Sequence, residues 1–347
     1  MRFINLILIL NFALFTLVSQ AADALLKPQS LKPGDTVALI SSGFRVSEAM
    51  DVEYATERLK ALGLKVIYGK AILEQTGYFA GTDEARAQEI NEMFANPKVK
   101  AIFELRGGWG SARLLDKLDY NLIKQHPKII IGFSDITALL LAINHQTHLI
   151  TFHGPMGSMP WPKMTTEYLK KVLFDGEQVT FTNPQFTSAE LANHSNDIIQ
   201  TEDRIQVINP GIARGRIIGG NLTVLTSLIG SRYLPKNWQG KILFIEEVDE
   251  DVYKIDRMME QLKLAGILDQ ISGFVFGLCT QCSAKTPYGS YRLQEVLKQY
   301  IQPLHIPAWY GALIGHHPKM FTIPEGALVE INAEQGSIHM LESAVKG

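Results

Sequence analysis

The chain has 347 residues, of which 46% are hydrophobic, and its formal net charge is −2. This length accommodates two domains with ordinary hydrophobic cores. The 33 lysines and arginines are nearly balanced by 35 aspartates and glutamates, and no basic stretch is interleaved with aromatic residues. The composition therefore excludes nucleic acid as a partner, because a polyanion needs a basic surface.

The first 21 residues predict a cleavable secretory signal rather than part of the fold. An apolar run covers residues 3–18, and Ser19-Gln20-Ala21 places small residues where a signal peptidase reads them. A membrane anchor is the alternative, but the run is short for a bilayer span and contains two asparagines. We expect cleavage near Ala22 and export, to the periplasm if the cell has an outer membrane, without stable membrane insertion afterwards.

The first half of the remaining chain alternates between strand and helix patterns. Such alternation predicts an α/β unit with a mostly parallel sheet covered by helices on both faces. Ligands of these sheets bind beyond the carboxyl ends of the strands. The predicted strands cover residues 36–40, 64–68, 99–104 and 128–131, and the predicted helices cover residues 47–62, 82–94 and 112–118.

The second half is richer in strand patterns and predicts a smaller mixed domain. A polar stretch over residues 184–203 separates the halves and is interpreted as a linker. The domains are therefore expected at residues 22–183 and 204–347. Strands are predicted at residues 215–220, 241–245, 273–277 and 327–331, and helices at residues 221–228 and 252–264.

The predicted strand at residues 128–131 leads through Gly132 into Ser134 and a helix. A serine at such a strand-to-helix corner can be a nucleophile, because the corner exposes its hydroxyl beside the free N–H groups of the helix start. The usual elbow has a glycine two residues after the serine, and Ile136 stands there instead. Helix capping by the same serine is the alternative interpretation.

A glycine-rich loop, Arg106-Gly107-Gly108-Trp109-Gly110-Ser111, also follows a strand and precedes a helix pattern. Its N–H groups could bind an anion, but the loop lacks the spacing of a dinucleotide fingerprint and the lysine of a P-loop. We interpret the N–H groups of Gly108 and Asp135 as an oxyanion hole for the elbow serine. A tight turn that simply requires glycines is the alternative.

A base and an acid are available in the second half. His316 lies in a glycine-flanked loop and could reach across a domain boundary, although a lone loop histidine is usually solvated. Glu246 ends an apolar strand, where pairing with an imidazole would satisfy its charge and fix the tautomer. Three other histidines, at 145, 148 and 153, have no metal-ligand spacing. Cys279 and Cys282 could form a disulfide, a redox pair or half a zinc site, and a structural or incidental role is favoured.

Five segments, in this order, resemble motifs of the LD-carboxypeptidases, the serine peptidases of family S66. The resemblance spans nearly the whole chain after the signal, with Leu313 where proline is common and Ile323 where leucine is common. The adjacent His317 leaves open which imidazole acts. The segments are Arg106 to Gly110, Gly132 to Thr137, Gly219 to Leu222, Leu243 to Glu247 with Tyr253 to Arg257, and Gly315-His316 with Ile323 to Gly326.

The resemblance implies a fold and an activity. The expected fold is a flavodoxin-like or Rossmann-like parallel-sheet domain followed by a smaller β-rich domain that resembles a swivelling β-barrel, in a homodimer. The expected triad is Ser134 as nucleophile, Glu246 to orient and stabilise the histidine, and His316 as general base and acid. The usual member releases the terminal D-alanine from murein tetrapeptides without a metal or organic cofactor, and Arg106 is the candidate partner of the D-alanine carboxylate.

Two other functions fit parts of the pattern. A close relative in the family cleaves acyl-nucleotide bonds to inactivate microcin C inside cells, which the predicted signal argues against. An exported anion-binding protein without catalysis is a more distant alternative. It predicts no turnover and no special effect of Ser134→Ala.

Overall fold

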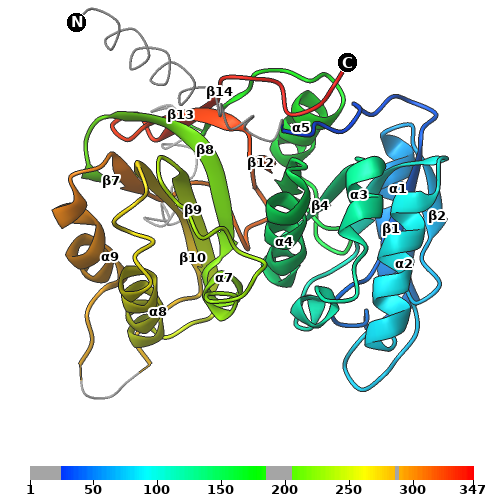
Figure 1. The fold of residues 1–347 in the computed structure, drawn as a ribbon, viewed down its shortest axis with the longest axis horizontal. Helices are drawn as coiled ribbons and strands as arrows, with labels where there is room; N and C mark the ends of the chain where they lie inside the picture. Colours follow the sequence, from blue (N-terminus) through cyan, green and yellow to red (C-terminus); the bar gives the residue numbers. More distant parts are fainter. Residues whose placement is uncertain (1–24, 185–204, 286–288) are drawn as a thin grey trace, which may run out of the picture.

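The computed structural model describes residues 25–184, 205–285 and 289–347, which form two β-sheets with their helices (Figure 1). The predicted signal at residues 1–21 and nearly all of the predicted linker lie outside these ranges. None of the helices within them is long and apolar enough to cross a membrane.

The first sheet has six strands in the order β12-β5-β4-β3-β1-β2, and all neighbours except β12 and β5 are parallel. The order β2-β1-β3-β4-β5 is that of flavodoxin-like folds, whose ligands bind at the switch point beyond β1 and β3. The elements of this half are β1 (Thr36–Ile40), α1 (Ala49–Ala61), β2 (Lys65–Tyr68), α2 (Asp83–Ala95), β3 (Val99–Glu104), η1 (Ser111–Leu114), α3 (Tyr120–Gln125), β4 (Ile129–Gly132), η2 (Ser134–Ile136), α4 (Thr137–Thr147), β5 (Thr151–His153), α5 (Lys163–Leu173) and β6 (Thr180–Thr182).

The second sheet has eight strands in the order β6-β14-β13-β8-β9-β10-β11-β7. Its centre, from β8 to β11, is parallel, and the flanking pairs are antiparallel. The elements are β7 (Gln206–Asn209), β8 (Ile212–Asn221), α7 (Leu222–Ser227), β9 (Ile242–Val248), α8 (Val252–Leu264), β10 (Gly273–Thr280), α9 (Leu293–Ile301), η4 (Gln302–Leu304), β11 (Ala308–Tyr310), β12 (Ile323–Glu325), β13 (Leu328–Asn332) and β14 (Ser337–Met340).

The strands of the first sheet are apolar on both faces because helices cover both. In β1, Val37 and Leu39 belong to one hydrophobic cluster, which includes residues of α1 and α5. Ala38 and Ile40 belong to the other, which includes residues of α2 and α4. This burial on both sides explains why the strands read as continuous apolar runs.

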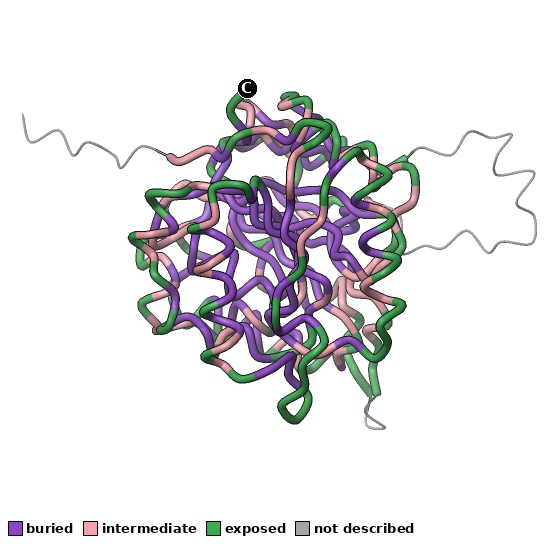
Figure 2. The backbone as a smooth tube through the Cα atoms, turned by 90° about the vertical axis from the view of Figure 1, so that its right-hand side faces the viewer, coloured by how far each residue is buried: buried purple, intermediate pink, exposed green. Residues whose placement is uncertain are grey.

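The two sheets exchange strands and share a core. β12 comes late in the chain but pairs with β5 of the first sheet, while β6 comes early and pairs with β14 of the second. Helix α4 lies between the sheets (Figure 1), and its residues share a cluster with residues of α7 and β9. Figure 2 shows the buried backbone continuing through the interior. Groups from the two halves are therefore held in fixed contact.

The structure confirms the predicted fold class, an α/β parallel-sheet domain with a separate β-rich domain. One predicted element is wrong. Residues 112–118 do not form an α-helix, because the chain makes only the short 3₁₀ turn η1 and then restarts as α3. Asp119 caps that new start, since its side chain accepts a hydrogen bond from Leu122 N.

Candidate active site

Ser134 stands at a strained corner beyond the end of β4. Its φ is 61°, a left-handed conformation that costs energy for any residue other than glycine. The corner is tight because Gly132, just before it, has no room for a side chain: a Cβ there would lie 2.9 Å from Ile136 Cγ2. Ser134 is partly exposed and begins η2, which leads into α4. This is the backbone geometry of a nucleophile elbow, although Ile136 replaces the usual glycine.

His316 joins this serine to a buried carboxylate. Its Nε2 lies 3.0 Å from Ser134 Oγ, and its Nδ1 lies 2.8 Å from Glu246 Oε2. The His316 side chain is 21% exposed and that of Glu246 is 0% exposed. The structure thus brings together three side chains that the sequence separates by up to 182 positions, with the histidine between the serine and the glutamate.

The backbone around the pair requires glycine. Gly315 has a φ of +111°, and a Cβ there would lie 2.4 Å from Glu246 Oε2. The absence of a side chain lets the histidine loop close over the carboxylate. On its other side, the His316 ring meets the edge of Phe133 at a centroid distance of 4.8 Å. The imidazole is therefore held between a carboxylate and an aromatic ring.

Electrostatics favour a charged pair. Burial by itself would lower the pKa of His316, but the charge and hydrogen bond of Glu246 outweigh it, so the pKa is raised above 6.5. Burial likewise acts to raise the pKa of Glu246, and the facing His316 overcomes this and lowers it. The carboxylate therefore stays ionised and stabilises an imidazolium when His316 accepts a proton.

The two adjacent histidines have different partners. His317 points elsewhere: its Nδ1 lies 3.0 Å from the carbonyl oxygen of Lys319 and 3.1 Å from the backbone N of the same residue. Of the two, His316 is the one hydrogen-bonded to Ser134 and Glu246.

The glycine loop lies directly against the serine. A Cβ at Gly107 would be 3.1 Å from Ser134 Cβ and 3.2 Å from Asp135 N, so the Gly107–Gly108 peptide borders the space in front of the hydroxyl. Gly108 has a φ of +112°, and a Cβ there would meet Phe44. Gly107, rather than Gly108, makes the close approach to Ser134, and the sequence analysis did not single it out.

Arg106 is partly buried beside the same loop. Its Nη1 donates to the carbonyl oxygen of Arg45 at 3.2 Å, and its guanidinium lies 5.9 Å from the centre of the Phe44 ring. These contacts orient the guanidinium along the loop after β1. These contacts do not test the expected role of Arg106 in binding a substrate carboxylate, which stays a prediction.

Buried polar groups fix the loops that surround the serine. Glu104, at the end of β3, accepts hydrogen bonds from the backbone N and the hydroxyl of Ser42. Burial raises the pKa of Glu104 to about 8, although those bonds lower it. Asp135 Oδ2 accepts from Ser111 N at 2.9 Å, and burial raises the pKa of Asp135 to about 6 against the lowering effect of that bond. The loops after β1 and β3 are thereby tied to the elbow.

His153 packs against Phe133, which also contacts His316, and the sequence analysis considered it only as a metal ligand. Its ring is fully buried between Phe133 and Phe244, with centroid distances of 5.9 and 5.3 Å. Burial lowers its pKa to about 4, so the ring is neutral at pH 7. Across residues 25–184, 205–285 and 289–347, no cluster of three or more His, Cys, Asp or Glu side chains could hold a metal ion.

The two cysteines, whose state the sequence left open, form a disulfide. Cys279 and Cys282 are joined with a Cα–Cα distance of 5.4 Å. The disulfide is thus observed, and its structural rather than redox role stays a prediction.

Two sequence profiles match this chain, the LD-carboxypeptidase N-terminal domain over residues 37–154 and the LD-carboxypeptidase C-terminal domain over residues 214–331. The chain belongs to the LD-carboxypeptidase family, S66. Both matched segments contain site residues: Ser134 and the glycine loop lie in the first, and Glu246 and His316 in the second. The family assigns this member to the peptidases, which are hydrolases.

Three relatives of this LD-carboxypeptidase family member show how far the similarity extends. The probable murein peptide carboxypeptidase of Bacillus subtilis is 36% identical over 309 residues, covering 89% of this chain and 92% of its own. The structure of the microcin C7 self-immunity protein MccF aligns with a TM-score of 0.81 and 31% identity over 92% of this chain and all of its own. Muramoyltetrapeptide carboxypeptidase from Oxalobacter formigenes aligns with a TM-score of 0.73 and 26% identity, covering 88% and 97%.

Proposed function

We propose that this protein is a serine-type LD-carboxypeptidase that releases the terminal D-alanine from murein tetrapeptides. The observation that carries the proposal is the unbroken set of contacts from Ser134 through His316 to the buried Glu246, with the serine on a strained corner. The similarity to murein peptide carboxypeptidases over nearly the whole chain supports the substrate class. The scissile bond would be the one between the L-centre of diaminopimelate and D-alanine.

The reaction would proceed in two halves. His316 Nε2 takes the hydroxyl proton as Ser134 Oγ attacks the diaminopimelyl carbonyl, and the imidazolium then donates that proton to the departing D-alanine amine. A water molecule attacks the resulting ester with His316 again as base, which frees the tripeptide and regenerates the serine. Glu246 keeps Nδ1–H as the donor and stabilises the charged ring throughout.

Two further roles complete the proposal. The N–H groups of Gly108 and Asp135 would stabilise the oxyanion. This role is supported by the close packing of the two loops, since a Cβ built at Gly107 would lie only 3.2 Å from Asp135 N. Arg106 would bind the free carboxylate of D-alanine through two hydrogen bonds. A normal KM for Arg106→Ala would show that this assignment is wrong.

The direct test is mass spectrometry of disaccharide tetrapeptide after incubation with the protein lacking residues 1–21. Loss of one alanine is expected for the wild type, and Ser134→Ala should reduce kcat by roughly 10⁴- to 10⁶-fold. An untouched tetrapeptide would contradict the substrate, and equal turnover by Ser134→Ala would contradict the nucleophile.

Cleavage of an acyl-nucleotide is the second candidate, because MccF has the higher structural similarity of the two solved relatives described above. One MccF structure contains aspartyl sulfamoyl adenosine. The same serine, base and acid would serve either substrate, since both reactions cleave a bond to an acyl carbon. Competition between such an acyl-nucleoside and the tetrapeptide, measured as kcat/KM for each, separates the two functions.

We further propose that the protein is exported and that its mature chain starts near Ala22. The apolar run over residues 3–18 and the Cys279–Cys282 disulfide support this proposal, because disulfides persist in oxidising compartments. An exported enzyme would trim stem peptides on the wall or released from it. N-terminal sequencing of protein from a periplasmic fraction tests the site, and a mature protein found only in the cytosol would contradict export.

A further inference from the structure

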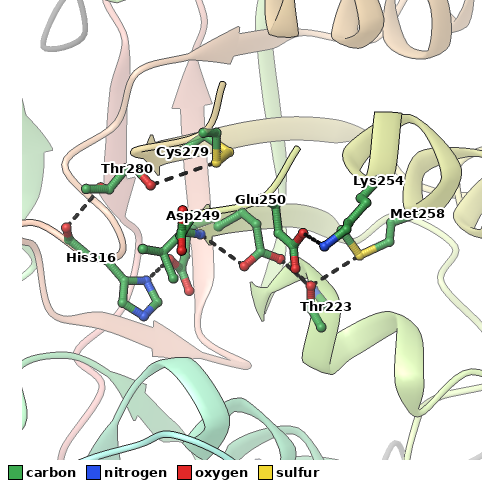
Figure 3. Close-up of a disulfide and its surroundings, with 12 residues drawn as sticks. Thr223, Asp249, Glu250, Lys254, Met258, Cys279, Thr280 and His316 are labelled. Carbon is green, nitrogen blue, oxygen red and sulfur yellow. Dashed lines mark hydrogen bonds and ion pairs between the residues drawn. A yellow bond between two sulfur atoms is a disulfide. The ribbon is translucent and has the colours of Figure 1, made fainter. Parts of the chain in front are cut away.

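A small disulfide-closed turn lies beside the loop that carries His316. The turn begins with the last two residues of β10, and Cys282 N donates to Cys279 O at 3.2 Å across it. Gln281, inside the turn, has a φ of 59°, which is a costly conformation for a residue with a side chain. Figure 3 shows Thr280 of this turn reaching toward His316. The disulfide therefore encloses a residue that contacts the proposed base.

The contact is a hydrogen bond from a side chain to the backbone. Thr280 Oγ1 donates to the carbonyl oxygen of His316 at 2.9 Å, and Leu278 N donates to the carbonyl oxygen of Ile314 at 3.0 Å. These bonds hold the chain on both sides of Gly315, whose φ of +111° is a conformation that favours glycine. β10 thus positions the His316 backbone, while Glu246 on the neighbouring β9 positions the ring.

The turn is also held by backbone contacts: Cys279 and Thr280 pair with Glu247 and Val248 of β9, and Ser283 forms a bridge with Asp251. Asp249 N donates to Thr280 O at 2.8 Å, and beyond the disulfide an exposed Lys285 forms an ion pair with Asp249. Gln281 and residues 283–285 are exposed. Exposed ion pairs contribute little because water screens them. The covalent link closes the turn around Thr280, and it is the one of these described restraints that a reductant removes.

We propose that Thr280 is a positioning residue for His316 and that the Cys279–Cys282 disulfide holds Thr280 in place. The inference rests on the proposed function, since it requires His316 to activate Ser134. Reduction by a dithiol would break the S–S bond: two electrons and two protons convert the cysteines to thiols, and the reagent becomes a cyclic disulfide. The released turn would loosen the His316 backbone and lower the reactivity of Ser134.

A fluorophosphonate probe tests this without any peptide substrate. Ser134 Oγ forms a bond to phosphorus, the P–F bond breaks, and the serine proton passes to His316. Thr280→Val should label roughly five- to tenfold more slowly, the effect of losing one neutral hydrogen bond, and Thr280→Ser should restore the rate to within about twofold. Thr56→Val is the matched control, because it loses a similar bond from Thr56 Oγ1 to Val52 O in α1, and it should label at the wild-type rate.

The disulfide is tested in the same assay. Treating the wild type with dithiothreitol, with the gain of two hydrogens verified by mass, should slow labelling by a similar factor. A Cys279→Ser/Cys282→Ser variant should start slow and be insensitive to the reagent. Circular dichroism and the fraction labelled at completion separate slow chemistry from loss of folded protein.

The pH profile of labelling distinguishes positioning from a purely structural role. The titratable groups that act on His316 are Glu246 and Glu247 of β9 and His153 of β5. Weaker contact with Glu246 would shift the acid limb of the Thr280→Val profile to lower pH, whereas loss of folded protein would change only its height. If the wild type is labelled at Ser134 and Thr280→Val shows the same labelling rate and the same acid limb, this inference alone is overturned. No labelling of the wild type would overturn the proposed nucleophile and this inference together.

Discussion

Glu246→Gln removes the charge behind the proposed base with almost no change in shape. The buried carboxylate has one oxygen 2.8 Å from His316 Nδ1, and its other oxygen has no hydrogen-bond partner among the described residues. If the amide oxygen faces the ring, an NH₂ group is buried in place of that second oxygen, which costs about 1–3 kcal/mol. If the NH₂ faces the ring, Nδ1 becomes the acceptor and Nε2–H points at Ser134, so the base is blocked.

Both orientations lower the rate, and we expect kcat to fall by roughly 10²- to 10⁴-fold. The pH dependence gives a second, independent result. His316 must be neutral to accept the serine proton, so kcat/KM rises with pH through its pKa, which Glu246 holds above 6.5. Without that charge, burial dominates and the pKa falls, so the acid limb moves to lower pH.

The assay is the initial rate of D-alanine release from disaccharide tetrapeptide between pH 5 and pH 9 for both proteins. Glu247→Gln is the matched control: Glu247 is also buried, but it accepts hydrogen bonds from Asn221 and Thr223 rather than from His316. It should lose stability and retain most of its activity per folded molecule. A Glu246→Gln enzyme within tenfold of wild type and with the same acid limb would refute the reasoning.

Three other outcomes are expected. Gly107→Ala would put a methyl group 3.2 Å from Asp135 N without requiring a left-handed backbone, so kcat/KM should fall about 10²-fold with little change in melting temperature, and an unchanged kcat/KM would place the oxyanion elsewhere. Burial raises the pKa of Glu104 to about 8, so folding must keep this carboxyl protonated above its unfolded pKa. The free energy of unfolding of the wild type should therefore fall relative to that of Glu104→Gln as the pH rises from about 4.5 toward 8, by about 3 kcal/mol at pH 7. Urea unfolding at several pH values measures this difference, and a difference that does not change with pH would show that Glu104 is ionised throughout. Leu139→Ala removes a fully buried side chain of α4 and should lower the free energy of unfolding by about 2–5 kcal/mol in the same assay, whereas a loss below 1 kcal/mol would contradict rigid packing between the sheets.

The sequence by itself determined the features that depend on neighbouring residues. The alternation of apolar strands and amphipathic helices indicated the parallel sheet, because burial on both faces gives continuous apolar runs. The corner at Ser134 could also be predicted from the sequence, since a strand followed by a glycine, a serine and a helix is a local pattern. The prediction of a helix at residues 112–118 was wrong. The composition of this segment suits a helix, but Asp119 caps a new helix that starts one residue later. The family resemblance supplied the pairing of Ser134 with Glu246 and His316.

Tertiary structure decided which distant groups meet. The choice of His316 over His317 depends on a loop that closes on Glu246 only because Gly315 lacks a side chain. The approach of Gly107 to the serine and the hydrogen bond from Thr280 to His316 O also join separate elements. No local pattern encodes these contacts, because strand order, register and the exchange of β6 and β12 between the sheets are set by packing of the whole chain.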